Sequence, residues 1–318
     1  MSTRPLLRVA LHAAAGLAIL LSGLGTLPLH ADNFVLPDGN GDLVGWQGVT
    51  IARQEDTLAD IARTFKLGHE EMRLANPDID FWLPGAGTEV VLPTRYILPR
   101  AERKGIVLNV PEMRLYFFPG AGPGEDPEVI TYPISIGRMD WSTPLGRHRI
   151  TAKIRDPSWT PPASIRQEAE AAGEPLPKFI PAGPDNPLGA FALRLDLPSY
   201  LIHGTNRPYG VGMRVTHGCI RMYPEDIERL FPEVQVGTGV NIVNQPVKVG
   251  WLGDTLFMEV HPPLEEDPIG EEELRRLALE LVEEADRERP VELLGRELLR
   301  VVREKRGIPE AISRGREK

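Results

Sequence analysis

Residues 203 to 222 bring together the side chains of this sequence that are best suited to covalent chemistry. The stretch reads His-Gly-Thr-Asn-Arg-Pro-Tyr-Gly-Val-Gly-Met-Arg-Val-Thr-His-Gly-Cys-Ile-Arg-Met, and its cysteine is the only one among 318 residues. His203 and His217 flank Cys219. A thiol becomes a good nucleophile near neutral pH when a base lies beside it, and glycines let a backbone approach a substrate closely. The stretch therefore predicts a nucleophilic Cys219 within a site formed by its own neighbours.

The first 31 residues have the pattern of an export signal. Arg4 and Arg8 precede an apolar run over about residues 9–29, and Ala31 offers a small residue for cleavage. The run is short for a membrane-spanning helix, so we favour cleavage after Ala31; a retained membrane anchor is the alternative. An exported protein meets an oxidising compartment, where a lone cysteine has no partner in its own chain. A buried structural cysteine is the other interpretation, and the neighbouring histidines and glycines favour the catalytic one.

The composition excludes one class of partner. The chain has 36 Lys and Arg against 45 Asp and Glu, a net charge of -9, and a pI near 5.4. Nucleic-acid binding requires basic patches that neutralise phosphates, so we expect no nucleic-acid partner. The length predicts one large domain or two to three smaller ones, and a hydrophobic fraction of 42% is enough for a core.

Two motifs carry a family resemblance. Ile202-His-Gly-Thr-Asn206, followed by Thr216-His-Gly-Cys-Ile-Arg-Met222, resembles the signature of the L,D-transpeptidases, the bacterial enzymes with a YkuD catalytic domain that cross-link or decorate peptidoglycan. Asn244-Gln-Pro-Val-Lys-Val-Gly-Trp251 is similar to the ErfK/YbiS branch, and the resemblance covers most of residues 46–262. It implies a β-sandwich fold and peptidoglycan as the partner.

The resemblance assigns the catalytic roles. Cys219 would form a thioester with a peptidoglycan stem peptide, and His203 would accept the thiol proton and return it to the leaving amine. A third group should orient the ring of His203, and because Gly204 has no hydroxyl, a backbone carbonyl is the expected orienting group. His217 is given a supporting role. Backbone amides around Gly218 and Cys219 are candidates for the oxyanion hole.

Four polar residues nearby are candidates for substrate binding. Arg221 lies two residues beyond the cysteine, on the same side of an extended segment, and its guanidinium suits a stem-peptide carboxylate. Arg221 could equally pair with an acidic neighbour. Asn206 and Arg207 are weaker candidates of the same kind. Thr216 is grouped with them and is also expected to support the turn.

A zinc site is the competing chemistry for His203, His217 and Cys219. Structural zinc usually needs four protein ligands at recognisable spacing, and the sequence has one cysteine and no CxxC or HExxH pattern. We therefore predict no metal and no other cofactor. A thioester retains the energy of the cleaved peptide bond, so transfer outside the cytoplasm needs no ATP.

Residues 46–94 read as a small β-α-α-β unit that resembles a LysM module, a domain that binds peptidoglycan glycans. By the resemblance, loops at Asp56, Thr57, Asn76 and Pro77 would line the glycan groove. Each residue also has a local interpretation, as a helix cap or a helix stop, which we favour for the single residues.

The remaining chain predicts a mainly β fold. Short strands with turns between them, and no βαβ alternation, favour a mostly antiparallel sheet or sandwich, which agrees with the YkuD-type β-sandwich. A long insertion over 155–189 is either an active-site lid or a flexible excursion. The expected domains are a signal peptide over 1–31, the LysM module over 46–94, the catalytic domain over 105–245 and a C-terminal helical segment over 264–306.

The leading hypothesis is a periplasmic L,D-transpeptidase that releases D-alanine from a tetrapeptide stem. The acceptor would be a diamino acid amine of another stem or a lysine of an outer-membrane lipoprotein. A thiol hydrolase, an L,D-carboxypeptidase with water as acceptor, is the first alternative. A non-enzymatic wall-binding protein with an inert Cys219 is the second.

Overall fold

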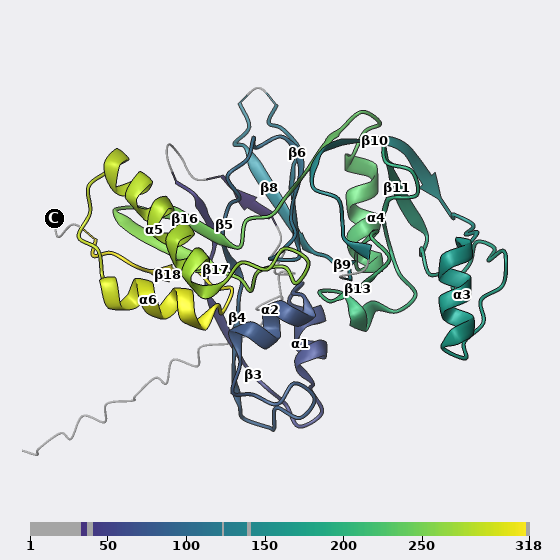
Figure 1. Cartoon of the computed structure of the whole chain (residues 1–318), viewed down its shortest axis with the longest axis horizontal. Coiled ribbons are helices and arrows are strands. Elements are labelled where there is room, and N and C mark those ends of the chain that lie inside the picture. The colour runs from purple at the N-terminus through teal and green to yellow at the C-terminus, as the bar shows by residue number, and fades with distance from the viewer. Residues whose placement is uncertain (1–32, 37–40, 123, 139–140, 316–318) are drawn as a thin grey trace, which may run out of the picture. The chain divides into compact units, whose positions relative to one another are not determined.

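The computed structural model describes residues 33–36, 41–122, 124–138 and 141–315 (Figure 1). The predicted export signal, residues 1–31, lies outside the described residues. A search of the described helices for a segment able to cross a membrane finds none.

A nine-stranded sheet forms the centre of the fold, in the order β1-β8-β7-β6-β15-β10-β11-β12-β14. Its inward side chains form a continuous apolar core that includes Leu115, Ile202 and Ile220. The fold is mainly β, as predicted, but the sheet is mixed, because β15 pairs in parallel with β6 and β12 with β14. The strands are β1 (Asn33–Val35), β6 (Gly105–Asn109), β7 (Arg114–Phe118), β8 (Glu128–Pro133), β10 (Gly146–Arg155), β11 (Phe191–Leu195), β12 (Leu201–His203), β14 (Ile220–Arg221) and β15 (Gly239–Val243).

Two helices and one short parallel pair complete this part of the fold. Helix α4 (Pro224–Glu233) packs its apolar face into the same core, and it begins with Pro224 at a position where proline is favoured. Strands β9 (Ile136–Gly137) and β13 (Arg214–Thr216) pair in parallel beside the site. Helix α3 (Ala163–Ala171) lies in the predicted insertion and has no buried residue.

Residues 46–94 have the predicted element order, with β3 (Gly48–Ile51), α1 (Leu58–Thr64), α2 (His69–Ala75) and β4 (Glu89–Leu92). Strands β3 and β4 pair antiparallel, and a small apolar core that includes Leu58, Met72 and Val90 joins them to the helices. The basic run over 95–104 that follows predicts a solvated linker, but the structure differs at its start. The run begins with β5 (Arg95–Ile97), which pairs with β2 (Leu43–Gly45) and buries Tyr96 and Ile97.

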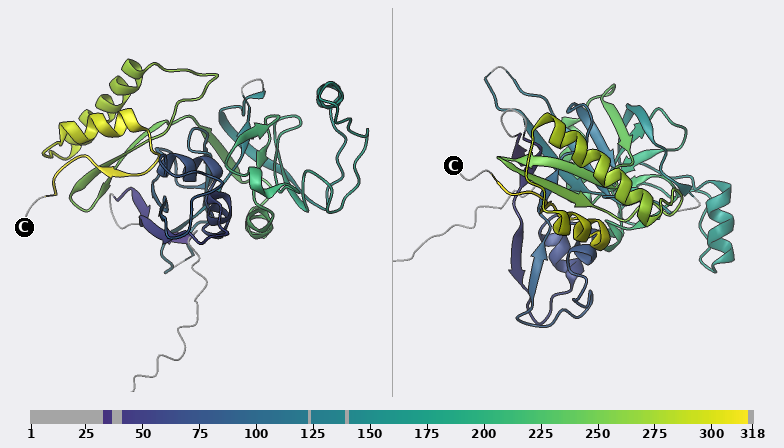
Figure 2. Two further views of the ribbon diagram at one scale, coloured as in Figure 1. Left: turned by 90° about the horizontal axis from the view of Figure 1, so that it is seen from below. Right: turned by 60° about the vertical axis from the view of Figure 1, so that its left-hand side comes forward.

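The C-terminal part is more than a helical segment. Strands β16 (Val247–Leu252), β17 (Thr255–Val260) and β18 (Glu310–Ala311) form a separate antiparallel sheet. Helices α5 (Glu271–Glu288) and α6 (Gly295–Glu304) cover this sheet, as Figure 2 shows, and share its apolar core. The amphipathic stripe of α5 therefore packs on a sheet formed by its own flanking sequence rather than on the catalytic sheet.

Candidate active site

The register of two parallel strands places the candidate residues on one face of the sheet. Ile202 of β12 pairs with Ile220 of β14, and His203 pairs with Arg221. The two isoleucines are fully buried in the core, so their neighbours point to the opposite face, because side chains alternate along a strand. On that face His203, Cys219 and Arg221 line a cavity of about 1090 Å³.

The imidazole of His203 is buried and has two backbone partners, Gly204 and Leu188. Its Nδ1 lies 2.7 Å from the carbonyl oxygen of Gly204, so the backbone partner expected from the sequence is present. A carbonyl only accepts a hydrogen bond, so Nδ1 carries the proton and Nε2 holds the lone pair in the neutral ring. Burial, helped by the nearby charge of Arg221, lowers the pKa of His203 to about 4. The ring is therefore neutral at pH 7.

The thiol of Cys219 is also held in its neutral form. Its Sγ donates to the carbonyl oxygen of Ser199 at 3.4 Å. Burial raises the pKa of the Cys219 thiol above its ordinary value, although a backbone hydrogen bond from Leu201 and the charge of Arg221 act in the opposite direction. The site at rest is thus a thiol beside a neutral imidazole rather than a thiolate beside an imidazolium.

The turn that presents the thiol is fixed through its carbonyl groups. Thr216 Oγ1 donates to the carbonyl of Cys219 at 2.6 Å, and Thr143 Oγ1 donates to that of Gly218 at 3.2 Å. Gly218 has φ of +95°, and a Cβ there would lie 2.7 Å from the ring of Tyr200, so only glycine fits. Within the described part of the chain, no acceptor takes a hydrogen bond from the amides of Gly218 or Cys219.

Arg221 lies in the cavity wall without a carboxylate partner among the described residues. Its Nε is buried and makes no hydrogen bond there. Burial lowers its pKa, and the charge of Arg207 lowers it further, which places a second guanidinium nearby. The alternative of an acidic neighbour for Arg221 is thus not seen in the described part of the chain. Asn206 is exposed, and its amide donates to the carbonyl of Asp185 at 2.9 Å.

The insertion contacts the site through one carboxylate. Glu168 of α3 lies 3.1 Å from His217 Nε2 and 2.5 Å from a guanidinium nitrogen of Arg138. Hydrogen bonds from Arg138 and His217 lower the pKa of Glu168. Trp159 and Ile165 of the insertion line the same cavity as Cys219. No sequence pattern indicates a role for Glu168, because its partners Arg138 and His217 lie far away along the chain.

Comparison with known proteins identifies the family. Residues 103–249 match the model of the L,D-transpeptidase catalytic domain, YkuD. The probable L,D-transpeptidase YcfS of Escherichia coli K12 is 41% identical over 246 residues, which cover 76% of each chain. The chain belongs to the L,D-transpeptidase family. The probable L,D-transpeptidase YbiS of the same strain is 42% identical over 238 residues, 74% of this chain and 76% of the relative.

Solved structures of the family are more distant. L,D-transpeptidase 3 from Mycobacterium tuberculosis is 16% identical, with a TM-score of 0.32 over 65% of this chain and 93% of that one. The assignment of this chain to the L,D-transpeptidase family therefore rests on its similarity in sequence to relatives such as YcfS and YbiS.

Of the four glycan-groove candidates in the N-terminal part of the transpeptidase, three have local roles for their side chains. Thr57 caps α1 in a capping box with Asp60, and Asp56 accepts from the amide of Arg53 at 2.8 Å. Asn76 is buried, and its amide group bonds to Met72 and to both backbone groups of Val91. The side chain of Asn76 therefore has the kind of local role that the sequence favoured, and glycan binding by these four residues stays a prediction.

The loop that follows Pro77 exposes two apolar residues, Trp82 and Leu83, that are not among the four candidates. Trp82 is 58% exposed, and the amides of Trp82 and Leu83 both donate to Asp80 Oδ1 at 2.9 Å. The carbonyl of Phe81 accepts from the amide of Leu58, which joins this loop to the start of α1. The Phe-Trp-Leu run in a polar segment is a sequence signal for exposed apolar side chains in a loop. The backbone of that loop is joined to the start of α1 through Phe81 and Leu58.

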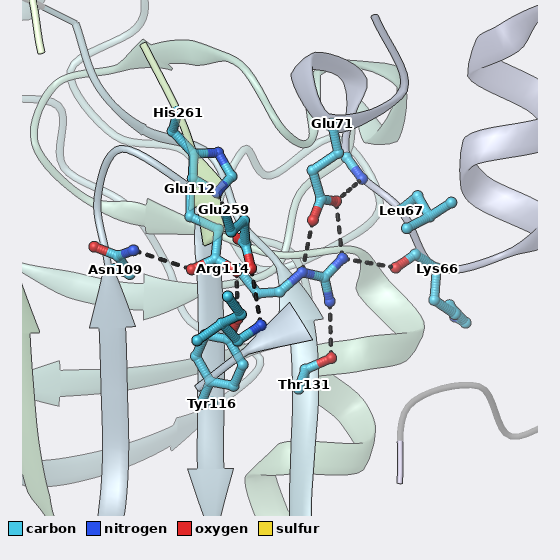
Figure 3. Close-up of polar contacts among 12 residues, drawn as sticks. Lys66, Leu67, Glu71, Asn109, Glu112, Arg114, Tyr116, Thr131, Glu259 and His261 are labelled. Carbon is cyan, nitrogen blue, oxygen red and sulfur yellow. Dashed lines mark hydrogen bonds and ion pairs between the residues drawn. The ribbon is translucent and has the colours of Figure 1, made fainter. Parts of the chain in front are cut away.

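A second polar cluster, Glu112, Lys248, Glu259 and His261, is the best geometric candidate for a metal site (Figure 3). The carboxylates of Glu112 and Glu259 and the ring of His261 converge there, and all are buried. However, Lys248 Nζ lies 2.8 Å from each carboxylate and already supplies a positive charge. Such a donor set does not favour a cation, so we interpret the cluster as structural.

Proposed function

We propose that this protein is a peptidoglycan L,D-transpeptidase in which Cys219 is the nucleophile and His203 the general base and acid. The observation that carries the proposal is the β12–β14 register, which brings His203, Cys219 and Arg221 to one cavity. Cys219 Sγ would attack the carbonyl of the third stem residue, and its proton would pass to Nε2 of His203. The proton would then pass to the amine of the departing D-alanine, leaving a thioester.

The neutral resting pair sets the timing of the proton transfer. Because the pKa of Cys219 is raised and that of His203 lowered, a thiolate would form only as the substrate carbonyl is attacked. The Gly204 carbonyl would hold the ring and stabilise the imidazolium that forms transiently. Because Cys219 and His203 are both neutral, an apolar or anionic substrate can also reach them without displacing a buried charge pair.

Two further groups have positions suited to the donor. The free amides of Gly218 and Cys219 would stabilise the oxyanion, and each such donor typically contributes about 3 kcal/mol to lowering the barrier. The unpaired guanidinium of Arg221 would bind the terminal carboxylate of the tetrapeptide. We assign His217 and Thr216 to the support of the turn that presents the thiol.

The acceptor decides between the two enzymatic readings. A diamino acid amine of a second stem, or a lysine of an outer-membrane lipoprotein, would give a new amide, whereas water would give a shortened stem. Incubation of the protein with purified disaccharide-tetrapeptide, followed by mass spectrometry, separates these outcomes. We expect a dimer smaller than two substrates by one molecule of D-alanine. Tripeptide alone, with or without a lysine-containing peptide added, would favour the hydrolase.

The non-enzymatic reading needs a different test from simple thiol reactivity. Slow alkylation of a cysteine at neutral pH ordinarily indicates an inert thiol. The raised pKa of the thiol predicts slow alkylation for the enzyme as well, so this measurement does not discriminate. Reaction with a tetrapeptide donor, which brings its own carbonyl to the site, is the informative assay. The predicted export signal would place this reaction in the periplasm.

We also propose that residues 46–94 bind glycan strands as a LysM module. The joined loops that carry Trp82 and Leu83 offer an apolar surface for a sugar ring. Sedimentation with insoluble peptidoglycan tests this: Trp82→Ala should weaken binding, while Trp46→Ala, a half-exposed tryptophan outside the two loops, should not. Equal binding by both variants would contradict the proposal.

A further inference from the structure

The loop between β12 and β13 connects the two halves of the site. Residues 204–213 begin directly after His203 and lead through β13 to the turn at Cys219. The loop carries Arg207 and runs beside Arg221, because a Cβ on Gly210 would lie 3.8 Å from a guanidinium nitrogen of Arg221. A shift of this loop would move Arg207 with it and would change the surface against which the guanidinium of Arg221 lies.

The backbone of the N-terminal module, residues 46–94, forms hydrogen bonds with the backbone of this loop. The amide of His69 donates to the carbonyl of Val211 at 3.0 Å, and the amide of Glu70 donates to that of Gly212 at 3.1 Å. Gly212 has φ of +87°, and a Cβ there would lie 2.2 Å from the amide nitrogen of His69. Two glycines, Gly68 and Gly212, face each other so that the two backbones can touch.

Residues 66–71, the segment that bonds to the loop, are also joined to the nine-stranded sheet. Arg114 of β7 forms two hydrogen bonds with the carboxylate of Glu71, at 2.6 and 2.8 Å, and both residues are buried; Figure 3 shows this pair. The same carboxylate accepts from the amide of Gly68. Lys66 Nζ lies 3.0 Å from Asp226 at the start of α4. The segment is thus held from both sides.

The other side of the loop is joined to the strand of the nucleophile. Ser135 Oγ donates to the carbonyl of Gly210 at 2.7 Å. The backbone of Ser135 exchanges two hydrogen bonds with that of Arg221, at 2.8 and 3.0 Å. A continuous set of contacts therefore runs from Glu71 in the module to the guanidinium in the cavity wall.

We propose that residues 66–71 of the N-terminal module are positioning residues for catalysis. They hold the loop 204–213, which carries Arg207 and runs beside Arg221, in the position where Arg221 binds the carboxylate of the donor. The inference rests on the proposed function, since it assigns the recognition of the donor carboxylate at that same site. It gives the module a second role beside glycan binding, in which it acts as a fixed part of the catalytic unit.

Gly212→Ala tests the inference, because a methyl group there must push the loop away from His69. The matched control is Gly237→Ala, at a glycine with a similar positive φ, +95° against +87° at Gly212, and with no atom within 4 Å of an added Cβ. The readout is the ratio of Cys219 acylation rates for a tetrapeptide donor with a free terminal carboxylate and the same donor as a terminal amide. A loss of general stability would lower both rates together and leave this ratio unchanged.

We expect the preference for the free acid to fall by about tenfold in Gly212→Ala, the scale of a charge-assisted hydrogen bond, and to persist in Gly237→Ala. If Gly212→Ala does not fold, Lys66→Ala, which removes only the ion pairs to α4, should give a smaller fall in the same direction. A wild-type preference retained in the folded variant would overturn the inference alone. A wild-type protein that forms no adduct with either donor would overturn the proposed function and the inference with it.

Discussion

His203 and His261 are buried to the same degree, at 4% and 3% exposure, but they lie in regions of opposite design. His261 Nε2 lies 2.6 Å from Glu259, and that carboxylate is shared with Lys248. Burial alone would raise the pKa of Glu259, but Lys248 and His261 outweigh it, and the pKa lies below its ordinary value. The cluster thus keeps its charges by pairing them.

In the candidate active site, His203 and Cys219 instead carry no charge at rest. The imidazole of His203 is hydrogen-bonded to neutral backbone groups, those of Gly204 and Leu188, and burial lowers its pKa to about 4. Cys219 beside it has a raised pKa, and both side chains line a cavity rather than packed protein. Burial in the Lys248 cluster stabilises the fold, because each buried charge there has a partner of opposite charge. Burial of His203 instead keeps the ring neutral beside a cavity, where it is available to accept a proton.

The largest expected effect is that of removing the nucleophile. Cys219→Ala should reduce transfer by at least about a thousandfold, since no other thiol is present, and should leave the midpoint of thermal unfolding within a few degrees of wild type. Product formation by mass spectrometry and a melting curve on the same sample check this. Retained transfer in the variant would place the chemistry elsewhere.

Removing Lys248, the central charge of the buried cluster, should lower stability and leave the rate of transfer nearly unchanged, the reverse of Cys219→Ala. Lys248→Met leaves Glu112 and Glu259 without their shared cation and should lower the free energy of unfolding by about 3–5 kcal/mol, as measured by urea denaturation. The rate per folded molecule should stay within about twofold. Lys104→Met, at an exposed lysine, is the control and should change stability by less than about 0.5 kcal/mol. A folded Lys248→Met protein without activity would make the cluster part of the site.

The pH dependence of donor acylation should reveal the lowered pKa of His203. The base must be neutral, so the rate should hold between pH 7 and about pH 5 and fall tenfold per unit below about pH 4. An acid limb near pH 6.5 would instead mean an imidazole in ordinary solvent.

The same shift has a consequence for stability with a defined sign. The unfolded chain binds a proton on His203 below about pH 6.5, whereas the folded chain does so only below about pH 4. Stability should therefore fall as pH drops from 6.5 to 4, by about 3 kcal/mol from this group. The difference between Cys219→Ala and the double variant Cys219→Ala, His203→Asn isolates it in urea unfolding at both pH values. Parallel curves for the two proteins would show that the ring is not desolvated.

The smallest effect should come from the ion pair that joins the insertion to the site. Glu168 is exposed, and exposed ion pairs contribute little, so Glu168→Gln should lower kcat/KM by less than about threefold. Glu174→Gln, an exposed carboxylate in the same insertion, provides the baseline. A loss of tenfold or more would show that the insertion must be anchored at His217 for turnover.

Much of the fold could be predicted because local patterns determine it. The apolar runs at 106–110 and 114–118 and the helical patterns over 58–65 and 70–76 predict elements that end within one or two residues of β6, β7, α1 and α2. The hairpin of β16 and β17 was missed, although Gly253-Asp254 between two apolar runs is a turn signal. Helix α4 also had a signal, since Pro224 and two acidic residues open an amphipathic stretch.

The site was predictable in its residues but not in its arrangement. The motif indicated His203 and Cys219 directly, and the missing hydroxyl at Gly204 indicated a carbonyl partner. The parallel pairing of β12 with β14, the contact of Glu168 with His217 and the grip of His69 on Val211 join residues that are distant in sequence. No local period or propensity encodes such contacts, because they follow from tertiary packing.

The central claim is that Cys219 and His203 form the reaction centre, and intact-protein mass spectrometry with a tetrapeptide donor and no acceptor tests it most directly. The account predicts an adduct equal to the donor less one D-alanine, mapped by digestion to the peptide that contains Cys219. It should be absent in Cys219→Ala and strongly slowed in His203→Asn. An adduct on another residue, or one that forms at the wild-type rate without His203, would contradict the account.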